Sequence, residues 1–288
     1  MGDTDIELPD NPIVDILTAK QVDPVWLFPD LALQGALVCI AGEPGSGKSY
    51  LSYHLGLAIA AGQPALGGLI PGGEPRRVLY FDEENSEQDR NKYLQRCWYG
   101  LMSQKHDPDL GLLYENFWPV HFWLGGKDWF EKAAIWIEHV RPHVIIFDTA
   151  TPCFNILNEN DNGEATQVVK QVRELMRMTD PVATAWIMKH AKTRTEKGGR
   201  RYIRGAKAWQ GMADAVIFQV KATGRPRRDG LNLTRMEPDK TRAFGLTRTI
   251  HITPRWTDAA KTGLALDGSY TASKDHKQAQ AEEDGDLE

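Results

Sequence analysis

The sequence predicts an α/β fold with a mostly parallel central sheet flanked by helices and with antiparallel strands at one edge. Three observations support this expectation. A short apolar run at residues 36–41 leads through a glycine-rich loop into a helical stretch at residues 51–61, which is typical of a strand–loop–helix unit. Further apolar runs alternate with helical stretches as far as residue 188, as in parallel sheets. Beyond residue 213 the apolar runs follow one another with little helix between them, which favours antiparallel neighbours.

The individual elements are placed by the spacing of apolar residues and by glycine and proline as breakers. Strands are predicted at residues 36–41, 77–81, 120–124, 144–148, 184–188, 213–220, 231–235 and 246–253. Helices are predicted at residues 51–61, 87–101, 128–140 and 163–178. The stretch between residues 62 and 77 is rich in glycine and proline and is expected to be a loop.

One domain is expected at residues 25–256, preceded by an arm or linker at residues 1–24 and followed by a disordered acidic tail at residues 257–288. No apolar run approaches the roughly 18 residues that a membrane span needs, and the acidic N-terminus has no signal-peptide pattern. The three cysteines are far apart and show no metal-binding spacing, which suits a reducing compartment. A cytoplasmic protein without membrane contact is therefore expected.

The glycine-rich loop at residues 42–49, with the sequence GEPGSGKS, matches the phosphate-binding pattern G-x-x-x-x-G-K-[ST]. Such a loop aims backbone N–H groups and a helix N-terminus at a phosphate chain. Lys48 is expected to reach the β- and γ-phosphates, and the Ser49 hydroxyl is expected to ligate Mg²⁺. ATP with Mg²⁺ is thus the expected cofactor. The residues expected to hold the nucleotide are Gly42, Glu43, Pro44, Gly45, Ser46, Gly47, Lys48, Ser49 and Tyr50.

A carboxylate motif follows about 100 residues after the P-loop. The apolar run at residues 144–147 ends in Asp148, which is the Walker B pattern of a buried strand that delivers one carboxylate to its C-terminal end. Ligands of open α/β sheets bind at these ends. Asp148 is therefore expected to hold the Mg²⁺ shell together with Ser49.

The order of these motifs resembles that of the RecA-fold motor ATPases, and most closely that of the RepA-type hexameric replicative helicases of plasmids and phages. After the P-loop, the segment YFDEEN at residues 80–85 stands where that group has a strand ending in a carboxylate pair. The segment MKHAK at residues 188–192 stands where it has a strand ending in His, and a basic loop and Lys-x-Arg follow. The resemblance covers about residues 25–253.

The resemblance implies roles for several residues. Glu84 would orient the attacking water as catalytic base, with Glu83 as the alternative, because neighbouring strand residues point to opposite faces. His190 would sense the γ-phosphate. Lys240 and Arg242 would reach the nucleotide of a neighbouring subunit in a hexameric ring, since the guanidinium fork suits phosphate oxygens.

A basic loop follows His190. Between residues 189 and 248, Lys and Arg outnumber Asp and Glu by 16 to 5, although the whole chain carries a net charge of −5. The loop around Gly198 and Gly199 combines basic side chains with Tyr202, a composition typical of contacts with single-stranded DNA. The residues expected to bind the nucleic acid are Lys192, Arg194, Lys197, Arg200, Arg201 and Arg204.

Two other interpretations remain open at this point. A recombinase or recombination mediator would use the same core to form a filament on DNA. A P-loop kinase or nucleotide switch would bind no nucleic acid, and arginines between residues 194 and 204 would then resemble the lid of such a kinase. The carboxylates at residues 82–84 favour hydrolysis, because a kinase rarely aims a carboxylate at water.

Overall fold

The computed structural model describes residues 25–28, 31–104, 109–192, 202–221, 231–241 and 248–271. The strands are β1 (Trp26–Phe28), β2 (Ala32–Leu33), β3 (Leu37–Gly42), β4 (Val78–Asp82), β5 (Phe117–His121), β6 (Val144–Asp148), β7 (Thr184–His190), β8 (Ala215–Lys221), β9 (Thr234–Thr241), β10 (Ile250–Trp256) and β11 (Leu264–Tyr270). The helices are α2 (Lys48–Ala61), α3 (Glu87–Ser103), α4 (Leu110–Asn116), α5 (Trp129–Val140), α6 (Ala150–Cys153), α7 (Asn162–Arg177) and α8 (Lys207–Met212).

A nine-stranded sheet runs through the middle of the molecule in the order β11-β10-β9-β8-β3-β7-β6-β4-β5. The six strands from β8 to β5 are parallel. The edge formed by β9, β10 and β11 is antiparallel, and β1 pairs with β2 in a separate small sheet. The predicted fold class is therefore confirmed.

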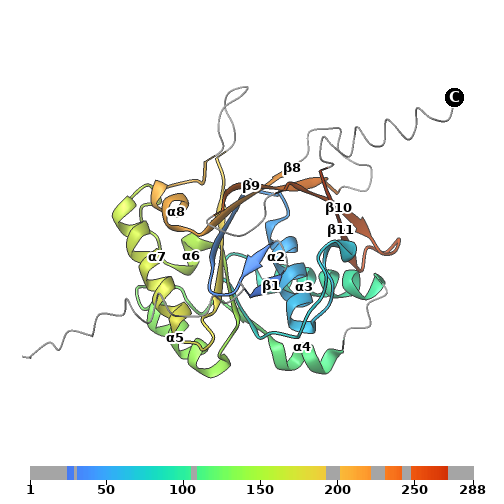
Figure 1. Ribbon diagram of the computed structural model, residues 1–288, viewed down its shortest axis with the longest axis horizontal. Coiled ribbons are helices and arrows are strands. Elements are labelled where there is room, and N and C mark those ends of the chain that lie inside the picture. Colours follow the sequence, from blue (N-terminus) through green and yellow to red (C-terminus); the bar gives the residue numbers. More distant parts are fainter. Residues whose placement is uncertain are drawn as a thin grey trace, which may run out of the picture.

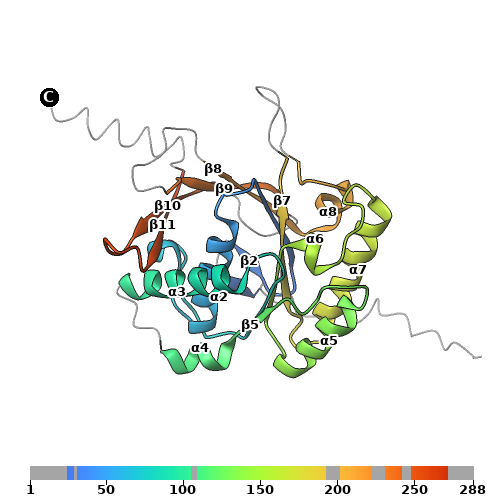
Figure 2. The same cartoon turned by 180° about the vertical axis from the view of Figure 1, so that it is seen from behind.

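Helices cover both faces of the sheet. Figure 1 shows α5, α6, α7 and α8 on one side and α2, α3 and α4 on the other, and Figure 2 shows the same layers from behind. Strands β3, β4, β6 and β7 are buried on both faces, as parallel strands usually are. In β6, Ile145 and Phe147 join the core beneath α5 and α7, whereas Val144 and Ile146 join the core beneath α2. Among the described residues, no helix has the length and apolar character that a membrane crossing requires.

The expected C-terminal boundary of the domain is wrong. A disordered tail is expected at residues 257–288, but β11 lies within them and pairs with β10 along its whole length, from Leu264 opposite Trp256 to Tyr270 opposite Ile250. Leu264 and Leu266 are buried. Only a few apolar residues stand among polar neighbours here, so the strand depends on its place beside β10. The residues from 272 onward, like the proposed arm at residues 1–24, lie outside the described part of the chain.

Other elements differ from the prediction in place or in existence. The strand expected at residues 120–124 lies at Phe117–His121, because the chain leaves the sheet at Phe122, where φ is 47°. Leu124 is nevertheless buried, which explains why the apolar run continues past the strand. Helices α4 and α8 are not predicted by the sequence pattern, since each is at most seven residues long.

Gly100 tests the packing of α3 on β11. A Cβ atom at this position would lie 2.0 Å from the carbonyl oxygen of Leu264. We expect Gly100→Ala to lower the free energy of unfolding by about 1–3 kcal/mol, because α3 or β11 must shift to admit the methyl group. Urea denaturation measures the difference. Gly211→Ala in α8 is the control, since no atom lies within 4 Å of its Cβ position. Equal stability of both variants would contradict this packing.

Candidate active site

The P-loop connects β3 to α2. Gly42 ends β3, and Lys48 is the first residue of α2. Gly45 and Gly47 have φ values of 69° and 83°, a left-handed conformation that glycine adopts without strain. At Gly42 a Cβ atom would lie 2.6 Å from the Ser46 hydroxyl oxygen. The geometry of the loop thus requires these glycines. The backbone of the loop passes directly into the start of α2.

The Lys48 ammonium group is held at this loop. Its Nζ donates hydrogen bonds to the carbonyl oxygens of Gly42 at 3.0 Å and Glu43 at 3.2 Å. Burial lowers the pKa of Lys48, whereas the charges of Asp148 and Glu84 raise it. A cation poised between its own loop and two carboxylates is suited to bind the phosphates of a nucleotide.

Gln219 of β8 supports the P-loop, and the sequence analysis did not identify it. Its Nε2 donates a hydrogen bond to the carbonyl oxygen of Ser46 at 2.9 Å, and its side chain is buried. The residue follows an apolar run and resembles any polar strand end, so only the pairing of β3 with β8, with Gly42 opposite Gln219, relates it to the loop.

The two glutamates after β4 have different surroundings. Glu83 accepts hydrogen bonds from the backbone N–H groups of Trp123 at 2.7 Å and Leu124 at 2.9 Å and is 7% exposed. Glu83 thus ties β4 to the segment after β5. Glu84 instead points toward the P-loop side, where its Oε1 lies 3.5 Å from His190 Nε2.

The environment keeps Glu84 ionised. The His190 ring lowers the pKa of Glu84, burial raises it, and Thr149 and Lys48 lower it further. An ionised carboxylate beside Lys48 can accept a proton from water. The structure therefore supports Glu84 over Glu83 as the candidate base.

Hydrogen bonds from neighbouring residues occupy the carboxylate of Asp82. It accepts hydrogen bonds from the Tyr53 hydroxyl, from the backbone N–H of Glu84 at 3.3 Å and from that of Asn85 at 3.0 Å. Its side chain is fully buried. Such a carboxylate stabilises the turn after β4 and has little capacity left for a ligand.

Asp148 is fully buried at the end of β6. Tyr80 donates its hydroxyl proton to Asp148 Oδ2 at 2.7 Å, whereas Oδ1 has no hydrogen-bond partner among the described residues. Burial raises the pKa of Asp148 to about 6, and the charges of Asp82 and Glu84 add to this effect, while the nearby hydroxyls of Tyr80 and Ser49 oppose it.

These surroundings fit a magnesium ion. A buried carboxylate oxygen that lacks a partner, next to the Ser49 hydroxyl, is the kind of oxygen site that Mg²⁺ uses together with water and nucleotide phosphates. The described residues contain no group of three or more His, Cys, Asp and Glu that could hold a metal alone, and a Mg²⁺–nucleotide site does not need one.

The basic loop begins and ends beside His190. Ala191 and Ile203 form an antiparallel bridge, and the backbone N–H of Arg204 donates to the His190 carbonyl oxygen at 2.8 Å. Arg204 is already engaged, because its Nε lies 2.9 Å from a Glu159 carboxylate oxygen. Lys192 lies at the base of the loop. The remaining residues proposed to bind DNA, Arg194, Lys197, Arg200 and Arg201, lie outside the described part of the chain.

Lys240 lies on β9, away from the P-loop. Its Nζ donates hydrogen bonds to the carbonyl oxygens of Gln210 at 2.9 Å, Gly211 at 2.7 Å and Ala213 at 2.9 Å. The side chain thus satisfies the C-terminal end of α8 in its own chain. Arg242, its proposed companion, lies outside the described residues.

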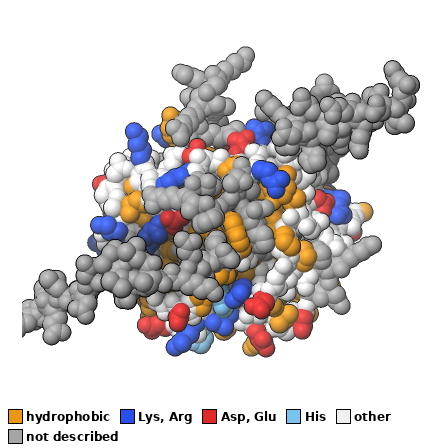
Figure 3. Space-filling view, viewed as in Figure 1, with side chains coloured by type: hydrophobic (Ala, Val, Ile, Leu, Met, Phe, Trp, Pro, Cys, Tyr) orange, Lys and Arg blue, Asp and Glu red, His pale blue; other side chains and the backbone are white. Residues whose placement is uncertain are grey.

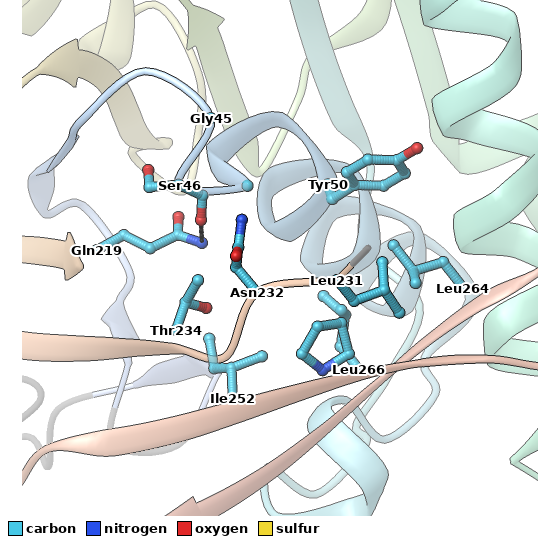
Figure 4. A pocket seen from close by; sticks show the side chains of 12 residues that line it. Gly45, Ser46, Tyr50, Gln219, Leu231, Asn232, Thr234, Ile252, Leu264 and Leu266 are labelled. Carbon is cyan, nitrogen blue, oxygen red and sulfur yellow. Dashed lines mark hydrogen bonds between the residues drawn. The ribbon is translucent and has the colours of Figure 1, made fainter. Parts of the chain in front are cut away.

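A pocket of about 170 Å³ opens beside the P-loop. Figure 4 shows the side chains of Leu231, Ile252, Leu264 and Leu266 on one side of it and that of Asn232 directed toward the loop. A cavity of similar size, ~150 Å³, accommodates one flat aromatic ring. Five of its twelve lining residues come from β9, β10 and β11, so the antiparallel edge of the sheet reaches the P-loop.

A family model for the AAA domain matches residues 3–196, which is more than half of the chain. The chain belongs to the AAA domain family. No curated protein matches the chain significantly. The AAA domain match includes the P-loop, Glu84, Asp148 and His190, and it identifies the protein as a P-loop ATPase. Gln219 and the pocket walls on β9, β10 and β11 lie beyond the matched residues.

Substitution of the two glutamates tests directly which of them is the catalytic base. We expect Glu84→Gln to reduce ATP turnover by about 10²–10⁴-fold, the usual effect of losing a general base. Nucleotide affinity should remain, because Lys48 and the P-loop are intact. Single-turnover hydrolysis and the binding of a fluorescent ATP analogue measure the two quantities.

Glu83→Gln is the matched control. Its amide oxygen can still accept from the N–H groups of Trp123 and Leu124, so turnover should stay near that of the wild type. Loss of turnover in Glu83→Gln with normal turnover in Glu84→Gln would reverse the assignment.

Proposed function

We propose that the chain is an ATP-hydrolysing RecA-fold motor that acts on DNA, as a hexameric helicase or ring ATPase in the replication of a plasmid, phage or mobile element. The observation that carries this proposal is the position of the two described ends of the basic loop. The bridge between Ala191 and Ile203 brings the two ends of the loop together beside His190. The His190 ring in turn contacts the candidate base Glu84. A ligand on the loop would therefore act on a segment whose two ends meet beside this candidate site.

The chemistry proposed for the site follows from its geometry. Lys48 leaves the carbonyl oxygens of Gly42 and Glu43 to bind the β- and γ-phosphates. Ser49 and Asp148 would hold the magnesium ion, which would neutralise phosphate charge. Glu84 accepts a proton from the attacking water, and His190 contacts the γ-phosphate and responds to its loss.

The proposed DNA contact is local. On the face seen in Figure 3, basic and acidic side chains are dispersed around hydrophobic ones, and the described basic residues do not gather into one broad field. A chain with a net charge of −5 would bind a nucleic acid through a confined basic segment. The six Lys and Arg between residues 192 and 204 provide one.

A ring assembly is the second part of the proposal. Lys240 and Arg242 would act on the nucleotide of the neighbouring subunit, for which Lys240 would have to leave the carbonyl oxygens at the end of α8. Particle images with an ATP analogue and single-stranded DNA distinguish the alternatives. Closed rings support this proposal, filaments support a recombinase or mediator, and monomers without DNA support a kinase or nucleotide switch.

We expect single-stranded DNA to stimulate ATP hydrolysis and Arg200→Ala/Arg201→Ala to abolish the stimulation. Basal hydrolysis should survive, because neither residue belongs to the P-loop or to the carboxylate motifs. The dependence of DNA affinity on salt should also weaken, by about 0.7 in log–log slope for each phosphate that the loop no longer neutralises. ATPase assays over a range of DNA and salt concentrations measure both effects. Arg204 is kept intact here, since its replacement would break the ion pair with Glu159.

The control for this experiment is Lys170→Ala/Arg177→Ala on α7, which removes the same charge from exposed positions. It should leave the stimulation unchanged. A normal DNA response in the loop variant, or an equal reduction in the control, would remove the loop from the proposed DNA site.

The pocket in Figure 4 is the proposed site of the nucleotide base. We expect Asn232→Trp to fill its mouth and to weaken ATP binding by roughly tenfold, equivalent to about 1.4 kcal/mol. Competition by inorganic tripolyphosphate, which needs only the P-loop, should be unaffected. Leu233→Trp is the control, because this neighbouring exposed residue does not line the pocket. Unchanged ATP affinity in Asn232→Trp would place the base elsewhere.

A further inference from the structure

Two tyrosines lie stacked between α2 and β4. The rings of Tyr53 and Tyr80 have centroids 4.3 Å apart with an angle of 6° between their planes. Both side chains are fully buried, so each hydroxyl needs a partner inside the protein. The two hydroxyls serve different carboxylates, since Tyr53 donates to Asp82 and Tyr80 donates to Asp148.

The Tyr80 hydroxyl belongs to a short chain of hydrogen bonds. Its oxygen lies 2.6 Å from Ser52 Oγ and 2.7 Å from Asp148 Oδ2. A hydroxyl has one proton, and Tyr80 donates its proton to Asp148. A proton between Ser52 and Tyr80 therefore has to come from Ser52, whose Oγ has a second acceptor in the Ser49 carbonyl oxygen at 3.0 Å. Ser52 stands one turn after Ser49 on α2. These hydrogen bonds therefore connect the helix that carries Ser49 to the carboxylate of Asp148.

This arrangement determines which oxygen of Asp148 is available. Oδ2 is occupied by Tyr80, whereas Oδ1 is buried and has no hydrogen-bond partner among the described residues. Without the Tyr80 hydroxyl, Oδ2 would lose its donor and the carboxylate would be free to rotate. A hydrogen bond of this kind usually orients a carboxylate that binds a metal or its water shell.

We infer that Tyr80 is a positioning residue for magnesium binding, because its hydroxyl holds Asp148 Oδ2 and leaves Oδ1 available to a metal ion or its water shell. Ser52 orients Tyr80 in turn. The inference rests on the Mg²⁺–nucleotide site proposed above and does not depend on DNA or on a ring. It adds Tyr80 and Ser52, to which the sequence motifs assign no role, to the residues that control magnesium binding.

The test is a Mg²⁺ titration of Tyr80→Phe with a fluorescent ATP analogue, read as the tightening of nucleotide binding. We expect the half-maximal Mg²⁺ concentration to rise by about 10–100-fold, the usual effect of removing a group that orients a metal ligand. Nucleotide affinity in EDTA should equal that of the wild type, because the P-loop is intact. Bound Mn²⁺, measured by electron paramagnetic resonance, gives a second readout that does not involve hydrolysis.

Tyr53→Phe is the matched control. It removes the same hydroxyl from the same buried stack, but the carboxylate that loses a hydrogen bond is Asp82. Its Mg²⁺ requirement should equal that of the wild type. If the stack had a purely structural role, both variants would change the Mg²⁺ requirement alike. Comparison of the two variants therefore separates a positioning role of Tyr80 from a contribution to stability.

Ser52→Ala keeps the experiment decisive if Tyr80→Phe does not fold. This variant leaves the Tyr80–Asp148 hydrogen bond without its anchor, so the Mg²⁺ requirement should shift in the same direction by a smaller factor. Unchanged Mg²⁺ dependence in Tyr80→Phe, or in Ser52→Ala where it alone folds, would overturn the inference. A wild-type protein whose nucleotide binding ignores Mg²⁺ would instead overturn the proposed magnesium site itself.

Discussion

The parallel register of β3, β7, β6 and β4 is the constraint on which the site depends. In this register Gly42 lies opposite His190, and Asp82 lies opposite Asp148. All four strands therefore end at the same edge of the sheet, where ligands of open α/β sheets bind. A shift of one residue in any pair would turn a site residue into the hydrophobic core, because neighbouring strand residues point to opposite faces. Burial of both faces of the sheet thus maintains the geometry of the site.

The same edge brings four carboxylates together, and their neighbours give each one a different role. Asp82 and Glu83 are held by donors of the protein itself, and Asp148 retains one free oxygen among the described residues. Glu84 contacts His190 and is stabilised in its ionised form. Lys48 is a cation beside this group, close enough to shift the pKa of Glu84. Hydrogen-bond donors, more than charge pairing, therefore distinguish structural carboxylates from those available to a metal ion or to water.

The antiparallel edge of the sheet also contributes to the pocket beside the P-loop. Strands β9, β10 and β11 lie beyond the matched AAA domain residues, yet they supply five of the twelve residues that line the pocket beside the P-loop. Gln219 on β8 supports the loop from the same side. The P-loop thus lies within the matched family residues, whereas Gln219 and part of the adjacent pocket belong to the C-terminal part of this chain.

The sequence by itself determined the alternation of strands and helices, the P-loop, Asp148 and the pair of glutamates, because these depend on local periodicity and on motifs contiguous in the chain. It did not determine β11, whose Leu264 and Leu266 are strand-forming only beside β10. The different surroundings of Glu83 and Glu84, and the contacts of Gln219, Ser52 and Tyr80, are visible only in the tertiary structure. Each depends on which backbone N–H, hydroxyl or ring another strand or helix brings within hydrogen-bond distance, and such pairings between distant segments arise only when the sheet and its helices pack.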